Sequence, residues 1–270
     1  MKILCLGDIV GKPGRAAVET LTPKLRKDLN LDFVIANAEN AAGGAGLTSR
    51  IAKSLLRNGC DVLTLGDHVW DQKELEGYLD ETDRVIRPAN FPDGVPGKGF
   101  CIHVASDGSK VAVINLIGRV FMRHMVESPF ASLQKILDIV KKETPVIIID
   151  MHAETTSEKV TIGHLADGDV SVVFGTHTHI QTCDEKVLPK GTAYITDLGM
   201  CGPYDSVIGQ NKEAIIKRFL TSMPIRFQVA KNGIELHGVI VDIDEKSGKA
   251  RSIERICRSF ELEENKAVSS

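Results

Sequence analysis

The feature that most constrains the fold is a repeated alternation of short apolar runs with stretches of helical periodicity. Apolar runs of strand length, each followed by a segment with helical spacing, occur at 2–6 then 15–29, 33–36 then 48–58, and 62–65 then 72–79. This rhythm is typical of βαβ units, which place parallel strands side by side. Two later runs, 146–149 and 170–174, are continuously apolar, as expected for strands that are covered on both faces. The sequence therefore predicts an α/β fold.

The remaining segments predict a hairpin and a C-terminal part of mixed character. Runs at 100–105 and 111–117 flank Asp107-Gly108, a turn pair that favours an antiparallel hairpin. In the last third, one helix is predicted at 212–220, and strands are predicted at 193–196, 225–230, 234–243 and 250–257. We expect this C-terminal third to pack as a second layer.

Composition and charge exclude several classes of protein. The 270 residues are 43% apolar and 26% charged, which is ordinary for a globular protein with a sizeable core. The formal net charge of -3 provides no general positive field, so extended nucleic-acid binding is disfavoured. Six scattered cysteines form no CxxC pair and are expected to be reduced, and no apolar stretch has the length of a signal or membrane-spanning segment. We expect a cytoplasmic protein with one domain over residues 1–260 and a flexible tail at 261–270.

Polar side chains gather directly after the predicted parallel strands. Ligands of open α/β sheets bind outside the carboxyl ends of the strands, so these residues form the candidate site. In chain order they are Asp8, Asn37, Glu39, Asn40, Asp67, His68, His152, His177 and His179. Carboxylate, amide oxygen and imidazole together suit borderline divalent metals such as Mn, Fe, Zn or Co. Seven or eight ligands exceed what one ion needs, so we predict two ions that share a bridging carboxylate, an arrangement characteristic of phosphate chemistry.

Individual members of this set have simpler explanations. A single aspartate after a strand, such as Asp8, is usually a turn or helix-capping residue. The pair His177 and His179 is harder to explain as core packing, because both imidazoles can turn from a loop toward one ion pair. Exposed or locally hydrogen-bonded roles are expected for His103, His124, His164 and His237. An anion-binding turn and a simple helix start would both explain the run Gly11-Lys12-Pro13-Gly14-Arg15.

Long motifs surround the candidate residues. They are Gly7-Asp8-Ile9-Val10-Gly11-Lys12-Pro13-Gly14-Arg15, Asn37-Ala38-Glu39-Asn40-Ala41-Ala42-Gly43-Gly44, Arg87-Pro88-Ala89-Asn90-Phe91-Pro92, His152-Ala153-Glu154, Gly175-Thr176-His177-Thr178-His179-Ile180-Gln181-Thr182 and Gly191-Thr192-Ala193-Tyr194-Ile195-Thr196-Asp197. These motifs resemble the calcineurin-like metallophosphoesterases, and more closely their YmdB-like bacterial subfamily of cyclic-nucleotide phosphodiesterases. The resemblance spans nearly the whole chain. It implies an α/β sandwich of two mixed β-sheets flanked by helices, and a metal-dependent phosphoric diester hydrolase.

The resemblance also implies how the candidate residues divide between two metal ions. One ion would be held by Asp8, Glu39, Asn40 and His179, and the other by Glu39, Asp67, His152 and His177, with Glu39 as the bridge. Iron and manganese are the expected metals, as divalent or mixed-valence ions, with zinc as an alternative. Val10 stands where the wider superfamily has a histidine, and Asn40 would replace that lost ligand.

Asp67 departs from the pattern of the family, which has asparagine at this position. With Asp8, Glu39 and Asp67 ionised, three negative charges meet two divalent ions, and a bridging hydroxide brings the formal sum to zero. Asparagine would leave one net positive charge, which attracts a phosphodiester anion more strongly. The sequence therefore predicts that Asp67→Asn raises catalytic efficiency or changes metal preference without affecting folding.

The predicted reaction is in-line attack of a metal-bridging hydroxide on a 2′,3′- or 3′,5′-cyclic nucleotide, with His68 as the general acid. Two alternatives remain: a phosphomonoesterase or phosphoprotein phosphatase with the same metal core, and a regulatory protein that binds a nucleotide with weak turnover. The expected partner is a small nucleotide or phosphodiester. No membrane partner is expected, and a homo-oligomer is left open.

Overall fold

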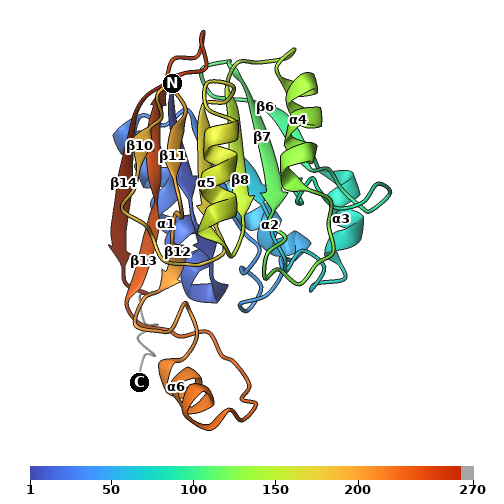
Figure 1. The fold of residues 1–270 in the computed structure, drawn as a ribbon. Helices are drawn as coiled ribbons and strands as arrows, with labels where there is room; N and C mark the ends of the chain where they lie inside the picture. Colours follow the sequence, from blue (N-terminus) through green and yellow to red (C-terminus); the bar gives the residue numbers. More distant parts are fainter. Residues whose placement is uncertain (263–270) are drawn as a thin grey trace.

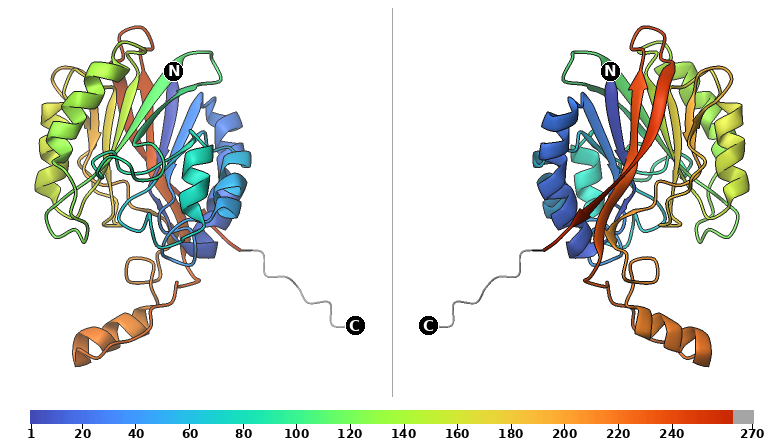
Figure 2. Two further views of the ribbon diagram at one scale, coloured as in Figure 1. Left: turned by 90° about the vertical axis from the view of Figure 1, so that its right-hand side faces the viewer. Right: turned by 90° about the vertical axis from the view of Figure 1, so that its left-hand side faces the viewer.

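Two β-sheets lie face to face at the centre of the protein, and helices cover the outer face of each sheet (Figure 1, Figure 2). The computed structural model describes residues 1–262. Helices α1 (Gly11–Leu29) and α2 (Ser49–Arg57) contact the first sheet. Helices α4 (Pro129–Val140) and α5 (Thr156–Leu165) contact the second sheet. This order of layers confirms the predicted sandwich of two mixed sheets flanked by helices.

The first sheet contains the strands that begin the chain and the long strands near its end. Its order is β2-β12-β13-β1-β3-β4-β5, and β14 pairs with β13. The strands are β1 (Lys2–Leu6), β2 (Asp8–Ile9), β3 (Phe33–Asn37), β4 (Val62–Thr64), β5 (Val85–Ile86), β12 (Met200–Pro203), β13 (Ile234–Ile243) and β14 (Ala250–Phe260). Strands β1, β3, β4 and β5 are parallel, as the alternating sequence pattern predicts, whereas β13 is antiparallel to its neighbours.

The second sheet is built from the middle of the chain. Its order is β10-β11-β9-β8-β7-β6. The strands are β6 (Phe100–Val104), β7 (Lys110–Ile117), β8 (Ile147–His152), β9 (Val172–Thr176), β10 (Lys186–Val187) and β11 (Ala193–Ile195). The four inner strands are parallel, and the two edge strands are antiparallel to them. Strands β6 and β7 form the hairpin that the sequence predicts around Asp107-Gly108.

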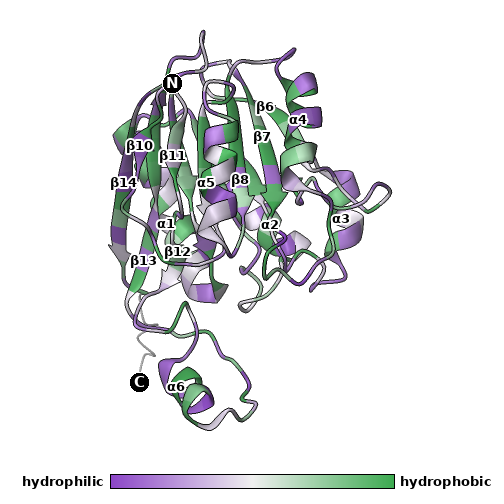
Figure 3. Cartoon of the chain, in the orientation of Figure 1, coloured by the Kyte–Doolittle hydropathy of each residue, from purple (hydrophilic) through white to green (hydrophobic). Residues whose placement is uncertain are grey.

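The parallel strands are buried on both faces. In β1, Leu4 and Leu6 belong to the apolar layer under the helices, while Ile3 and Cys5 belong to the layer between the sheets. A third apolar layer separates the second sheet from α4 and α5. Burial on both sides is the reason that these strands have continuous apolar sequences rather than an alternating pattern (Figure 3).

Two sequence-based expectations about the C-terminal third are wrong. This part does not form a second layer, because β13 lies between β12 and β1 in the first sheet, and β10 and β11 complete the second. The strand predicted over 225–230 does not form either. Its pairing is limited to an isolated bridge between Gln210 and Val229, and Arg226, Phe227 and Gln228 are exposed, with no sheet to pack on.

The four predicted helices form with shifted ends, and α4 and α5 form in addition to the helices named from the sequence. α1 begins at Gly11 rather than at residue 15, and Pro13 lies in its first turn, where its missing N–H costs no helix hydrogen bond. α3 (Leu75–Glu81) is shorter than the predicted 72–79 helix at its start. α6 (Lys212–Thr221) begins after Asn211, whose side-chain oxygen accepts a hydrogen bond from the Ala214 N–H at 2.9 Å.

The segment around α6 projects from the end of the sandwich to which the inner strands run (Figure 1, Figure 2). We call residues 204–233 the arm. Within α6, Ile215 is buried, whereas Phe219 and Leu220 are more than four-fifths exposed. The arm therefore adds little to the core and lies beside the candidate site.

The single domain over 1–260 stays a prediction. Most of the predicted flexible tail, 261–270, lies outside the described residues. Within residues 1–262, no helix combines the length and the apolar character that crossing a lipid bilayer requires.

Candidate metal centre

The predicted site residues come together at one end of the sandwich, where strands of both sheets finish. Asp8 lies in β2, Glu39 and Asn40 follow β3, and Asp67 follows β4. From the second sheet, His152 ends β8, and His177 and His179 follow β9. Because two sheets packed face to face both end here, side chains from either sheet can reach one cluster.

One group of four predicted ligands is very compact. The ligating atoms of Glu39, Asp67, His152 and His177 all lie within 4.8 Å of one another. Nε2 of His152 is 3.2 Å from Oε1 of Glu39 and 3.1 Å from Oδ1 of Asp67. Nδ1 of His177 is 3.3 Å from the same Asp67 oxygen. Two carboxylates and two imidazoles that converge in this way form a donor set suited to a divalent metal ion.

A second group, made of Asp8, Asn40 and His179, adjoins the first, because Asp8 lies near His152. Nε2 of His179 is 3.3 Å from Oδ1 of Asn40 and 3.9 Å from Oδ1 of Asp8. Nδ1 of His152 is 4.0 Å from Oδ1 of Asp8, and both side chains are fully buried. The structure thus gathers all seven residues that the family resemblance implies as ligands, and their assignment to two ions stays a prediction.

Hydrogen bonds select the nitrogen that each histidine presents to the cluster. Nδ1 of His152 donates to the Thr176 hydroxyl at 2.9 Å, and this hydroxyl donates to buried Asp150 at 2.7 Å. His152 therefore directs Nε2 toward Glu39 and Asp67. Nδ1 of His179 lies 2.9 Å from the carbonyl oxygen of Ile208, which leaves Nε2 as the ligand atom. Such outer hydrogen bonds are typical of metal-binding histidines.

His177 is oriented by a residue that the sequence analysis did not assign to the site. Its Nε2 is 3.2 Å from Oε2 of Glu154, so Nδ1 is the nitrogen that faces Asp67. His177 has a φ of 94° and His179 a φ of 64°, in the left-handed region that non-glycine residues seldom occupy. This local strain bends the loop so that both imidazoles point to one cluster.

The charges of the cluster also fit a bound cation. Burial raises the pKa of Asp8 well above its usual value, and the negative charges of Asp197 and Glu39 add to this effect. Burial also disfavours ionisation of Asp67, but hydrogen bonds from His152 and His177 outweigh it and hold its pKa far below the usual value. Buried carboxylates collected in this way need a nearby positive charge to remain ionised together. The residues present therefore fit metal ions.

Glycines leave the space in which the ligands meet. A Cβ built on Gly66 would overlap with Oε2 of Glu39 and with Nε2 of His152. A Cβ on Gly7 would overlap with the carbonyl group of Gly199, next to Asp8. Only glycine permits these close approaches, so Gly66 and Gly7 belong to the site although neither has a side chain.

His68, predicted as the general acid, borders the cluster without being part of the compact group. Its backbone N–H donates to Oε2 of Glu39 at 3.1 Å. Its Nδ1 is 2.6 Å from Oδ2 of Asp71, and the other Asp71 oxygen is 2.6 Å from Nη2 of Arg123. This chain orients the imidazole and leaves Nε2 as the nitrogen that can meet a substrate.

Sequence reasoning missed several residues around the cluster. Asp71, three residues after His68, could have been found from that spacing, whereas Arg123 and His124 lie far away in the sequence and contact the Asp67 carbonyl oxygen. His124, for which an exposed or locally hydrogen-bonded role is expected, is half-buried, and its Nε2 lies 2.7 Å from the carbonyl oxygen of Asp67. In the Gly11–Arg15 run, Arg15 donates to the carbonyl oxygen of Ala41, which favours a helix start over an anion site.

A cavity of about 570 Å³ opens onto the cluster. Its walls come from residues 43–45, from the strand-end residues and from the arm, including Gln210 and Phe227. Loops 88–99 and 118–129 contribute no residue to its described lining. Three residues of the arm, Ile208, Gln210 and Phe227, line it beside the strand-end residues.

Comparisons with known proteins agree with this geometry. The fold and site define a metallophosphoesterase-type phosphoesterase. The sequence model of the YmdB-like protein family matches residues 4–256. The chain belongs to the YmdB-like family.

Relatives of known description support this membership. A 2′,3′-cyclic-nucleotide 2′-phosphodiesterase from Bacillus subtilis is 50% identical over 256 residues, which cover 95% of this chain and 96% of the relative. A putative phosphatase/phosphodiesterase of Mycoplasma genitalium is 39% identical over 263 residues, with 95% and 92% coverage. The chain is thus similar to phosphoesterases over nearly its whole length, and it is itself an enzyme of this class.

Solved structures show the same fold. A hypothetical protein from Thermus thermophilus has a TM-score of 0.89 at 39% identity, covering 96% of this chain and 99% of that protein. A novel phosphatase from Mycoplasma pneumoniae has a TM-score of 0.89 at 35% identity, with 96% and 93% coverage. The predicted fold and family are therefore confirmed.

Proposed function

We propose that this enzyme is a dinuclear-metal phosphodiesterase that hydrolyses cyclic nucleotides in the cytoplasm. The observation that carries the proposal is the single cluster of Asp8, Glu39, Asn40, Asp67, His152, His177 and His179 beneath one cavity. The activity printed for the Bacillus subtilis relative supports 2′,3′-cyclic nucleotides as substrates. Iron and manganese are the proposed metals, since carboxylate, amide and imidazole donors suit both.

Two bound divalent ions would supply Lewis acidity, which lowers the pKa of a water molecule and offsets charge on the phosphoryl oxygens. The protein contributes the position of the ligands and a proton donor. The hydrogen bonds that reach Asp150 and Glu154 would fix the imidazoles of His152 and His177 in the orientation needed to hold the ions. His68 then donates a proton to the leaving oxygen on the side opposite the attack.

His68→Ala is expected to lower turnover by about a hundred- to ten-thousand-fold while the metal content stays unchanged, because a general acid contributes this range. Steady-state kinetics and elemental analysis of the purified variant would measure both quantities. His164→Ala, a change at an exposed histidine of α5, is the matched control and should behave as wild type. Turnover of His68→Ala within a few-fold of wild type, with metal still bound, would contradict the assigned role.

Asp67→Asn is expected to raise kcat/KM for a phosphodiester by about tenfold, or to change the preferred metal, because it removes one negative charge from the cluster. The amide oxygen can still accept a hydrogen bond in the place of Asp67 Oδ1, which lies 3.1 Å from Nε2 of His152, so folding should be retained. Kinetics with Mn²⁺ and Fe²⁺, together with thermal denaturation, test this. Equal kinetics and equal metal content in the two proteins would refute it.

The central experiment is elemental analysis of the purified enzyme combined with hydrolysis of 2′,3′- and 3′,5′-cyclic nucleotides. We expect about two metal ions per chain and turnover of a cyclic diester. A chromogenic diester should be hydrolysed faster than the corresponding monoester under Mn²⁺. The reverse preference would favour the phosphomonoesterase, and nucleotide binding by metal-loaded protein without hydrolysis would favour a regulatory role.

A further inference from the structure

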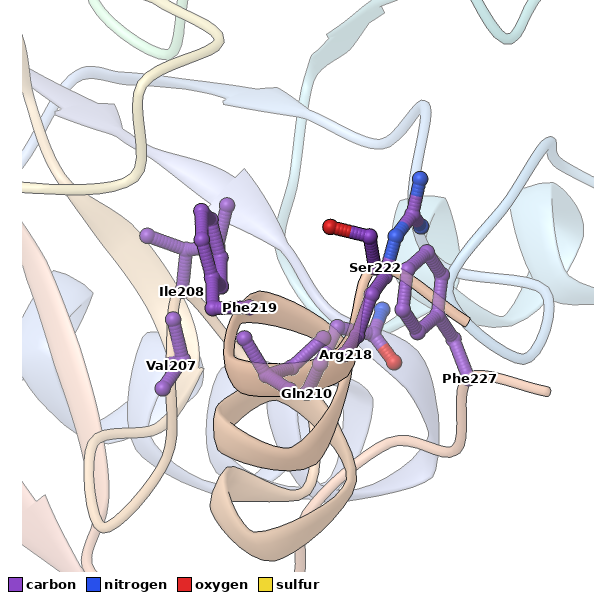
Figure 4. A pocket seen from close by; sticks show the side chains of 8 residues that line it. Val207, Ile208, Gln210, Arg218, Phe219, Ser222 and Phe227 are labelled. Carbon is purple, nitrogen blue, oxygen red and sulfur yellow. The ribbon is translucent and has the colours of Figure 1, made fainter. Parts of the chain in front are cut away.

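A second cavity opens against the arm. It has a volume of about 570 Å³ and is lined by α6 and by the chain on both sides of that helix. Figure 4 shows its side chains, which include Ile208, Gln210, Arg218, Phe219 and Phe227. Most of this lining is apolar, and its polar groups are few.

This second cavity adjoins the metal-site cavity. Ile208, Gln210 and Phe227 line both of them. The carbonyl oxygen of Ile208 also lies 2.9 Å from Nδ1 of His179, one of the predicted ligands. A molecule whose phosphate lies at the metal cluster could therefore extend past these three residues into the second cavity.

The lining combines a flat aromatic surface with a hydrogen-bonding group. The guanidinium carbon of Arg218 lies 4.8 Å from the centre of the Phe227 ring, and Phe227 is 44% exposed. Gln210 offers both an amide donor and an amide acceptor at the junction of the cavities. Aromatic rings and arginine planes are the surfaces on which nucleobases stack, and amides bond to the edges of bases.

We propose that the second cavity binds the nucleobase of the substrate, with Phe227 stacking on the base and Gln210 hydrogen-bonding to its edge. The proposal rests on the proposed function, because a phosphodiester without a base would leave this cavity unused. Stacking tolerates every base, and one amide can serve a donor or an acceptor. All four cyclic nucleotides should therefore be substrates, with modest differences between them.

The test compares a 2′,3′-cyclic nucleotide with 1-O-methylribose 2′,3′-cyclic phosphate, which lacks the base. The measured quantity is the ratio of kcat/KM for the nucleotide to kcat/KM for the base-free substrate. We expect Phe227→Ala to lower this ratio about tenfold, mainly through KM, and Phe227→Tyr to keep it, because the tyrosine ring can still stack. Leu220→Ala, on α6 but outside the lining of both cavities, is the control and should leave the ratio unchanged.

A binding measurement separates this proposal from the proposed function. Calorimetry with metal-loaded protein should show tighter binding of adenosine 3′-phosphate than of ribose 3-phosphate, and Phe227→Ala should remove most of that difference. If the wild type hydrolyses neither substrate, the proposed function fails and calorimetry alone decides on the base site. Equal ratios in wild type and Phe227→Ala, or equal binding of the two phosphates, would overturn the base site and leave the hydrolase intact.

Discussion

Glu39→Gln should lose most of its bound metal and lower kcat/KM by about a thousandfold or more. Oε1 of Glu39 lies 3.2 Å from Nε2 of His152, and Oε2 accepts a hydrogen bond from the backbone N–H of His68. Both carboxylate oxygens of Glu39 are therefore engaged within the site. Removing its charge weakens the predicted bridge between two ions. Bound ions stabilise the charge of a transition state by several kcal/mol. Each 1.4 kcal/mol of lost stabilisation lowers the rate about tenfold. Elemental analysis and kinetics on the same preparation would measure both effects.

Glu143→Gln is the matched control for this change. Glu143 is exposed and pairs with Lys110 at 2.9 Å. It precedes the start of β8, whereas His152 ends that strand, so its replacement should affect neither metal content nor turnover. Thermal denaturation of both variants would verify that they fold. A Glu39→Gln protein with full metal content and kcat/KM within tenfold of wild type would show that this carboxylate is not a shared ligand.

Gly66→Ala is expected to disable the enzyme by adding a single methyl group. The new Cβ would overlap with Oε2 of Glu39 and Nε2 of His152, so at least one of these groups would have to move. A displacement near 1 Å in a catalytic arrangement can cost about a hundredfold in rate. We therefore expect a loss of about a hundredfold or more in kcat/KM and a reduced metal content, measured as for Glu39→Gln.

Gly77→Ala gives a direct comparison, because a Cβ at Gly77 in α3 meets no atom within 4 Å. Alanine in a helix interior is more stable than glycine by roughly 0.5–1 kcal/mol, so this variant should keep its activity and unfold at a slightly higher temperature. If Gly66→Ala also retained activity and metal, the close packing of ligands around Gly66 would not be needed for function.

Most strands of the two sheets could be predicted because their residues carry a local signal. In β1 and β8, burial on both faces requires continuous apolar runs, and such runs are visible in the sequence. The segment 225–230 alternates apolar and polar residues, as a half-buried strand would, but forms no strand. Strand formation depends on a partner, and the arm provides only an isolated bridge between Gln210 and Val229.

The place of the C-terminal strands was not visible for a related reason. The apolar pattern of β13 shows that it is a strand, but not that it lies antiparallel between β12 and β1. Pairing between distant segments is set by which edges are free and which faces match once the whole chain is folded. The same holds for the arm, whose residues line the cavity although they are separated in the chain from the strand-end ligands.

By itself the sequence determined the residue types of the site, since carboxylates, an amide and histidines follow strands that had to be parallel. It also determined the family, because the motifs around these residues are long. Only the tertiary structure decided which nitrogen each histidine presents, through partners such as Thr176 and Glu154. It alone placed Gln210 and Phe227 beside the candidate metal ligands. Ligand chemistry is a property of single residues, whereas orientation and cavity shape arise from contacts between segments that are distant in the chain.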